Sequence, residues 1–177
     1  MAVLVEAISV IVPSAAIEAR YPGGWEAFRR LVPNSTLCSD AELVRIGFMA
    51  PMDAKAFVDQ LQKAGLVFVR NGKAVDVAVV DQLQGPTSAC DWLEYGHFLI
   101  GDGPERVAAC RLAGSRSTQV ATPPGWEYAR SLSAMHPFVP TDAVSRELKY
   151  LRGENGMDVY LNRKTGKEVY MGRTRSG

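Results

Sequence analysis

The stretch VLVEAISVIV, residues 3–12, is rich in β-branched and other apolar side chains. Such a run favours extended backbone, and Pro13 ends it because proline has no amide hydrogen for the ladder of a sheet. We therefore predict a β-strand at the start of the chain. Glu6 interrupts the apolar run and no Lys or Arg precedes it, so we do not expect a signal peptide.

The segments that follow alternate between predicted helices and strands. Ser14 can begin a short helix, which the next Pro-Gly-Gly break ends, and a second short helix is expected from Trp25. Residues 42–49 alternate as a strand does, with apolar side chains on one face. A third helix is expected from Pro51, which suits a first helical turn, to Gly65, which can end it.

The middle of the chain predicts antiparallel strands. Asn71 and Gly72 form the pair that a two-residue type I′ turn prefers, so residues 66–80 are expected to be a hairpin. Residues 91–100 and 106–113 predict two more strands, joined by the turn GDGP. Together these segments indicate an α+β fold with a mostly antiparallel or mixed sheet and helices packed on one face.

The rest of the chain divides by composition. Residues 114–140 contain four prolines and are expected to form an irregular Pro-rich cover, which completes an α+β domain over residues 1–140. Residues 141–177 are expected to be an appendage that consists of a C-terminal helix, TDAVSRELKYL, and a basic β-hairpin.

The C-terminal hairpin, DVYLNRKTGKEVYM, has two candidate loops. A two-residue Thr-Gly loop would place Lys164 opposite Lys167, which is unfavourable because like charges repel. A three-residue Lys-Thr-Gly loop is preferred and pairs Tyr160 with Tyr170. The hairpin then has one apolar face that needs a cover, so a homodimer through this hairpin is one expectation.

Composition limits the class of protein. The 177 residues are 47% hydrophobic and 22% charged, as in an ordinary globular domain, and three scattered cysteines favour reduced thiols in the cytoplasm. No apolar stretch approaches the roughly 18 residues of a membrane span, so we expect a soluble protein. A net charge of +1 gives no strong field for nucleic acid. The C-terminal segment is basic and carries tyrosines, but docking on a protein surface is favoured there over nucleic acid.

Common catalytic and cofactor motifs are missing. GDGPER fits neither G-x-G-x-x-G nor the Walker pattern, and the chain has no G-x-S-x-G elbow. Two histidines and three dispersed cysteines show no metal-ligand spacing, so neither a metal nor another cofactor is expected. Cys90 could act as a nucleophile only if His97 or His136 came close to it, and a small buried hydrophobe is the favoured interpretation.

A Trp-Glu pattern recurs along the chain. YPGGWEAFRR, residues 21–30, is echoed by TPPGWEYARS, residues 122–131, and the third tryptophan stands in CDWLEYG. These elements could form the rim of a recognition surface, because tryptophan is enriched at binding hot spots. They could equally be ordinary core anchors with an acidic residue in the first helical turn, and that interpretation is favoured. The rim candidates are Trp25, Trp92, Glu94, Trp126 and Glu127.

A second candidate site lies in SACDWLEYGHF, residues 88–98. Strand alternation would place Asp91, Tyr95 and His97 on one face, where a carboxylate, a phenol and an imidazole could transfer protons or bind a polar ligand. His136, from the Pro-rich cover, could add a fourth polar group. The favoured alternative is a mixed polar face that is merely solvated.

Two function hypotheses follow from the sequence. The first is a binding or protein-interaction module without a catalytic motif, of which an inhibitor or immunity-type protein would be one concrete form. The second is a small-molecule-binding domain or enzyme with a polar pocket around Asp91, Tyr95 and His97, between the sheet and the Pro-rich cover. A deep cavity with convergent polar groups would favour the second hypothesis, and an exposed Trp-Glu patch would favour the first.

Overall fold

The first predicted strand is divided between two sheets. The computed structural model describes residues 1–135, 148–154, 157–163, 166 and 168–172. Within residues 3–12 it places two strands, β1 (Ala2–Leu4) and β2 (Ile8–Pro13). The break comes at Ala7, whose φ of 48° is left-handed and therefore redirects the chain. The prediction of one continuous strand is wrong because each half pairs with different partners.

A five-stranded antiparallel sheet contains β2 at its centre. The strand order is β3-β4-β2-β7-β8, and all the pairs in it are antiparallel. Val10 lies opposite Ile46 on one side and opposite Val79 on the other, so β2 is hydrogen-bonded along both edges. The partner strands are β3 (Cys38–Ser39), β4 (Leu43–Phe48), β7 (Ala78–Asp81) and β8 (Gly85–Pro86).

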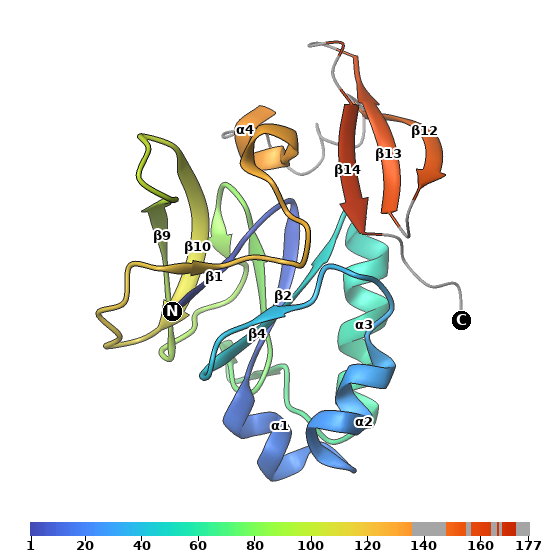
Figure 1. Cartoon of the computed structure of the whole chain (residues 1–177). Helices are drawn as coiled ribbons and strands as arrows, with labels where there is room; N and C mark the ends of the chain where they lie inside the picture. The colour runs from blue at the N-terminus through green and yellow to red at the C-terminus, as the bar shows by residue number, and fades with distance from the viewer. Residues whose placement is uncertain (136–147, 155–156, 164–165, 167, 173–177) are drawn as a thin grey trace.

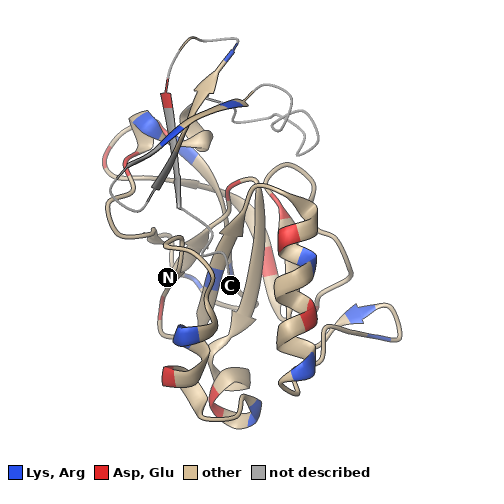
Figure 2. Ribbon diagram, turned by 90° about the vertical axis from the view of Figure 1, so that its right-hand side faces the viewer, with Lys and Arg blue, Asp and Glu red and all other residues tan. Residues whose placement is uncertain are grey.

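Three helices cover one face of this sheet. They are α1 (Ser14–Arg20), α2 (Gly24–Leu31) and α3 (Pro51–Lys63). Their buried side chains, including Ile17, Phe28 and Phe57, pack on Val10 and Ile46 in the first core. As predicted, α3 begins at a proline, and its exposed side carries acidic and basic residues in turn (Figure 2).

A second sheet packs on the opposite face of β2. It has the order β11-β1-β10-β9, and its strands beyond β1 are β9 (Leu93–Leu99), β10 (Arg106–Leu112) and β11 (Val120–Ala121). Ile11 and Val80 from the first sheet pack on Leu93 and Cys110 in a second core. In Figure 1, α3 and the β9–β10 pair accordingly lie on opposite sides of β2 and β4. The β1–β11 pair is parallel and the other pairs of this sheet are antiparallel, so the predicted α+β class with a mostly antiparallel or mixed sheet is confirmed.

The Asn-Gly turn is confirmed, but the hairpin around it is short. Asn71 and Gly72 have φ values of 53° and 77°, as the central residues of a type I′ turn must. The flanking strands are only β5 (Val69–Arg70) and β6 (Lys73–Ala74). Backbone hydrogen bonds from Val75 to Phe68 and from Asp76 to Val67 continue the pairing of the two arms, and beyond them β7 pairs with β2 instead.

The end of the chain forms a third sheet, of order β12-β13-β14. The cover before it contains the 3-10 turn η1 (Tyr128–Arg130) and the short helix α4 (Leu132–Met135). The strands are β12 (Leu148–Glu154), β13 (Met157–Asn162) and β14 (Glu168–Gly172). The predicted C-terminal helix is wrong over residues 148–151, which pair with β13 as a strand, and its earlier part lies outside the described residues.

The predicted register of the last hairpin is wrong by one residue. Tyr160 lies opposite Val169, and Val159 lies opposite Tyr170. Gly166 does take the left-handed conformation, with a φ of 68°, but its amide donates to the carbonyl of Asn162 at 2.8 Å and so closes a longer loop. Packing explains the shift, because Tyr160 is fixed by its neighbours on β12 and in the third core.

The third sheet contacts the rest of the protein. Leu148 belongs to a third core together with Ala7 and Leu132, and Met49 and Tyr160 pack against this cluster. The predicted appendage therefore covers residues close to the break between β1 and β2. Among the described residues, no helix is both long and apolar enough to cross a membrane.

A buried guanidinium lies beside this break. Arg45 on β4 is only 3% exposed. Its Nε donates to Ser9 Oγ at 2.9 Å, and its terminal nitrogens donate to the carbonyls of Glu6 at 3.2 Å and Thr36 at 3.3 Å. Since buried polar groups need partners, this side chain satisfies three acceptors from two segments, residues 6–9 and Thr36.

Replacing this guanidinium tests its contribution to stability. We expect Arg45→Met to lower the free energy of unfolding by about 3 kcal/mol, because each buried acceptor left unpaired costs about 1–3 kcal/mol. Urea unfolding followed by circular dichroism measures the change. The matched control is Arg29→Met, which removes only an exposed ion pair to Glu26 and should change stability by less than about 0.5 kcal/mol. Equal effects of the two variants would contradict the assignment.

Candidate functional site

The structure brings together two of the three residues predicted to share a face of β9. The rings of Tyr95 and His97 meet edge to face, with centroids 5.9 Å apart. Asp91 lies before the strand begins, and its carboxylate forms an exposed ion pair with Lys73 Nζ at 2.7 Å. The carboxylate that the proton-transfer hypothesis needs beside the imidazole of His97 is therefore paired with a lysine of the β5–β6 hairpin. His136 lies outside the described residues.

Tyr95 is anchored rather than free to react. Its hydroxyl donates to the carbonyl of Gln82, and its ring lies against Gly85, where an added Cβ would come within 3.0 Å of the ring. Burial, followed by the nearby Cys110 and Asp81, raises the pKa of the phenol to about 12. The side chain is therefore neutral at physiological pH, and Gly85 leaves room for it.

The three tryptophans do not form one rim. All three are half-buried, but each packs in a different place. Trp25 stacks on Phe28 in the first core with ring centroids 5.9 Å apart. Trp92 packs on the second core and donates to the carbonyl of Ala74 at 3.3 Å. Trp126 donates to a buried carboxylate at the break between β1 and β2.

The Trp-Glu echo has a local structural explanation. Glu26 pairs with Arg29 at 3.8 Å, and Glu127 pairs with Arg130 at 3.5 Å, three residues on in both cases. Each pair is exposed and follows a half-buried tryptophan, on helix α2 in one copy and on η1 in the other. The third glutamate, Glu94, pairs with an arginine across the β9–β10 ladder. These contacts favour core anchors over a shared recognition surface.

Glu6 is the buried acid that receives Trp126. This carboxylate is 6% exposed and accepts three hydrogen bonds, all from the Pro-rich cover. Trp126 Nε1 donates at 3.2 Å, while the amide and hydroxyl of Ser133 donate at 2.9 and 2.6 Å. Sequence reasoning did not make Glu6 a candidate, although a lone acid inside an apolar run is itself a signal that a partner must be supplied.

A polar pocket, which we name the cover pocket, lies between β10 and the cover. Its volume is about 450 Å³, which falls within the range of small-molecule sites. Among the described residues, His97 is the one sequence candidate that lines it. The described lining residues are Gln82, His97, Pro104, Glu105, Arg106, Ala108, Tyr128 and Ser133.

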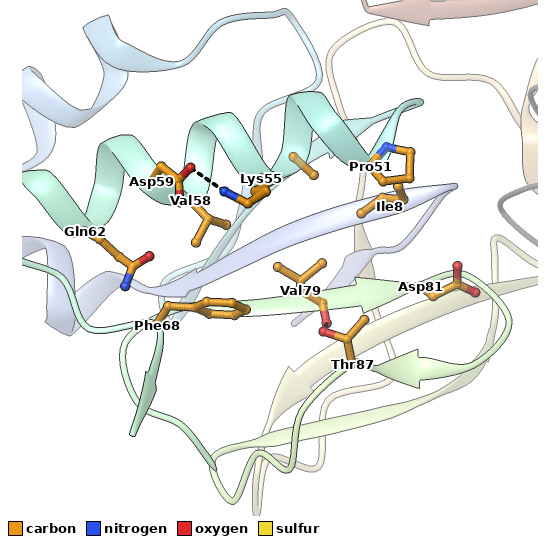
Figure 3. Close-up of a pocket in the computed structure, with 11 residues that line it drawn as sticks. Ile8, Pro51, Lys55, Val58, Asp59, Gln62, Phe68, Val79, Asp81 and Thr87 are labelled. Carbon is orange, nitrogen blue, oxygen red and sulfur yellow. Dashed lines mark hydrogen bonds and ion pairs between the residues drawn. The ribbon is translucent and has the colours of Figure 1, made fainter. Parts of the chain in front are cut away.

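A second hollow, which we name the α3 groove, is mainly apolar. It has a volume of about 470 Å³ and lies between α3 and the face of β7. Figure 3 shows Val58 extending from the helix toward Val79 and Phe68. None of its residues was a candidate from sequence, because they come from segments that only the fold brings together. The lining is Ile8, Pro51, Ala54, Lys55, Val58, Asp59, Gln62, Phe68, Val79, Asp81 and Thr87.

The three cysteine side chains lie in the second core or pack against it. Burial raises the pKa of Cys90, and the same effect raises the pKa of Cys38 and Cys110. A raised pKa lowers the thiolate fraction, which is the opposite of what a nucleophilic cysteine requires. Across the described residues, no group of three or more His, Cys, Asp or Glu side chains could hold a metal ion.

Glu6 can be tested by the accessibility of the cover. We expect Glu6→Gln to lower the free energy of unfolding by about 1–3 kcal/mol, because glutamine has one acceptor oxygen where Glu6 has two. If that oxygen accepts from Ser133, the amide nitrogen faces the Nε1 donor of Trp126 and cannot accept from it. The variant should also be cut faster by trypsin after Arg116 or Arg130. Glu26→Gln, which changes an exposed acid, serves as control. Unchanged cleavage in the Glu6 variant would mean that the carboxylate does not hold the cover.

Tyr95 can be tested by alkaline titration. Because the phenol ionises near pH 10 in the unfolded chain and near pH 12 in the folded one, its contribution to stability is complete below pH 10 and is lost as pH rises toward 12. Phenolate absorbance should show a late step that Tyr95→Phe lacks. Stability should fall less steeply in this variant over the same window, and the persistence of the late step in Tyr95→Phe would assign it to another tyrosine.

Comparison with known proteins adds no functional information to this geometry. No protein-family model matches the chain, and neither a curated protein nor a solved structure matches it. The α3 groove, the cover pocket and the contacts around them are the features that bear on function.

Proposed function

We propose that the protein is a binding module that holds an amphipathic helix of a partner protein in the α3 groove. The observation that supports this proposal is the apolar hollow beside α3, over β7 of the first sheet. Val79 on β7 belongs to the edge of the first core and is only half-buried. A further helix packed next to α3 would complete its burial.

The dimensions of the groove suit a helix. The lining residues of α3 recur at helical spacing over its 13 residues, which corresponds to a length of roughly 20 Å. Neighbouring helices pack about 8–10 Å apart, so a partner beside α3 would lie over β7. Its apolar stripe would meet the groove floor, which consists of Ile8, Val58, Phe68 and Val79.

The rim of the groove supports binding through apolar contact. Lys55 and Asp59 form an ion pair at 2.8 Å with each other, and Asp81 accepts from the amides of Leu83 and Gln84 at 2.8 and 3.1 Å. The charged groups at the rim thus have partners already. Met52, at 77% exposed, follows Pro51 on α3 and lies next to Lys55 and Asp59 by helical spacing, so it extends the apolar surface beyond the groove.

A library of displayed random peptides tests the proposal. Peptides selected on the wild-type protein should carry apolar residues at helical spacing, and their binding should be lost with Val79→Glu, which puts a charge on the groove floor. The matched control is Val69→Glu, at an exposed valine on β5, which should leave binding unchanged. Gln62→Trp fills the groove from its exposed edge and should also abolish binding.

Two outcomes would overturn this function. One is selected peptides without any helical apolar spacing, and the other is binding that survives both Val79→Glu and Gln62→Trp. Urea unfolding of each variant shows whether lost binding reflects the groove or a damaged fold, since Gln62→Trp leaves the buried core untouched.

A further inference from the structure

We propose that the cover pocket binds a small zwitterion, a molecule of amino-acid size that carries one carboxylate and one amine. This site is separate from the α3 groove and shares no lining residue with it.

Two opposite charges line the cover pocket without partners. Glu105 and Arg106 are adjacent in sequence at the start of β10, and both line the pocket. Within the described residues, neither side chain forms an ion pair or a hydrogen bond. By contrast, Arg111 on the same strand pairs with Glu94 at 2.8 Å. The cover pocket therefore presents a carboxylate and a guanidinium that are both available to a ligand.

The sign of these charges selects the ligand class. A simple anion would be attracted by Arg106 but repelled by Glu105, and a simple cation would meet the reverse. A ligand with both charges would satisfy both groups, and guanidinium-carboxylate contacts are among the stronger hydrogen bonds in proteins. A cavity of about 450 Å³ leaves room for the side chain of an amino acid as well.

The remaining walls supply ring and hydroxyl groups. Tyr128 comes from the cover and His97 from β9, and both line the pocket. The Tyr128 hydroxyl has no hydrogen-bond partner among the described residues and can donate to a ligand carboxylate. Pro104 and Ala108 add apolar surface that a ligand side chain can contact.

The floor of the pocket is fixed in advance by buried contacts. Ser133 is held by two hydrogen bonds to the Glu6 carboxylate. Gln82 forms two hydrogen bonds with Ala7, both at 2.9 Å. Its side-chain oxygen accepts from the backbone amide of Ala7, and its own backbone amide donates to the Ala7 carbonyl. Pre-organised walls reduce the entropy lost on binding, which favours a defined ligand site.

Binding of free amino acids tests the inference directly. Thermal-shift measurement with each free amino acid identifies the best ligand, and calorimetry then compares it with two analogues of the same side chain, the decarboxylated amine and the deaminated acid. We expect each analogue to bind at least about ten-fold more weakly, because each lacks one charge-assisted contact. A deaminated acid that binds as tightly as the amino acid would overturn the inference and indicate a plain anion site.

Variants assign the two charges separately. With Arg106→Met, the amino acid should bind no better than its decarboxylated amine, and with Glu105→Gln it should bind no better than its deaminated acid. Arg70→Met, on the exposed strand β5, is the matched control and should bind as the wild type does. Failure of every amino acid to bind, or binding unchanged in both pocket variants, would contradict the inference. Val79→Glu should leave amino-acid binding intact, which separates this result from the fate of the α3 groove.

Discussion

The buried carboxylate of Glu6 connects the parts of this fold that are distant in sequence. Its side chain accepts three hydrogen bonds from the Pro-rich cover, while its own carbonyl accepts from Arg45 on β4. The next residue, Ala7, takes a left-handed φ of 48° and is bound in both directions by Gln82. A charge buried this deeply persists only when such donors surround it, so both sheets and the cover must meet at this point.

Both candidate sites lie next to Glu6 and Ala7, one on each side of the break between β1 and β2. Ile8, the first residue after the break, forms part of the floor of the α3 groove. On the other side, Ser133 and Gln82 are fixed by Glu6 and Ala7 and form part of the cover pocket. The point where the chain changes sheets, at the left-handed residue Ala7, thus has the apolar α3 groove on its helical side and the polar cover pocket under the Pro-rich cover.

Local patterns in the sequence predicted much of the fold. The Asn71-Gly72 turn, the helix from Pro51 and the β9–β10 pair follow from nearest-neighbour chemistry, and the structure has all of them. Predictions at the C-terminus were less successful. Residues 148–151 have helical spacing, yet they pair with β13, because cross-strand contacts and the packing of Leu148 outweigh weak helix propensity. For the same reason the last hairpin differs from its predicted register.

Taken by itself, the sequence determined the α+β class, most helices and turns, and the pairing of Tyr95 with His97 on one strand face. Tertiary structure alone decided where the chain changes sheets and which polar groups meet. Glu6 and Ser133 are 127 residues apart, and Ala7 and Gln82 are 75 apart, so no local spacing could join them. Periodicity reports which face of an element is buried, whereas a site depends on which elements come together, and that is set by the packing of the whole core.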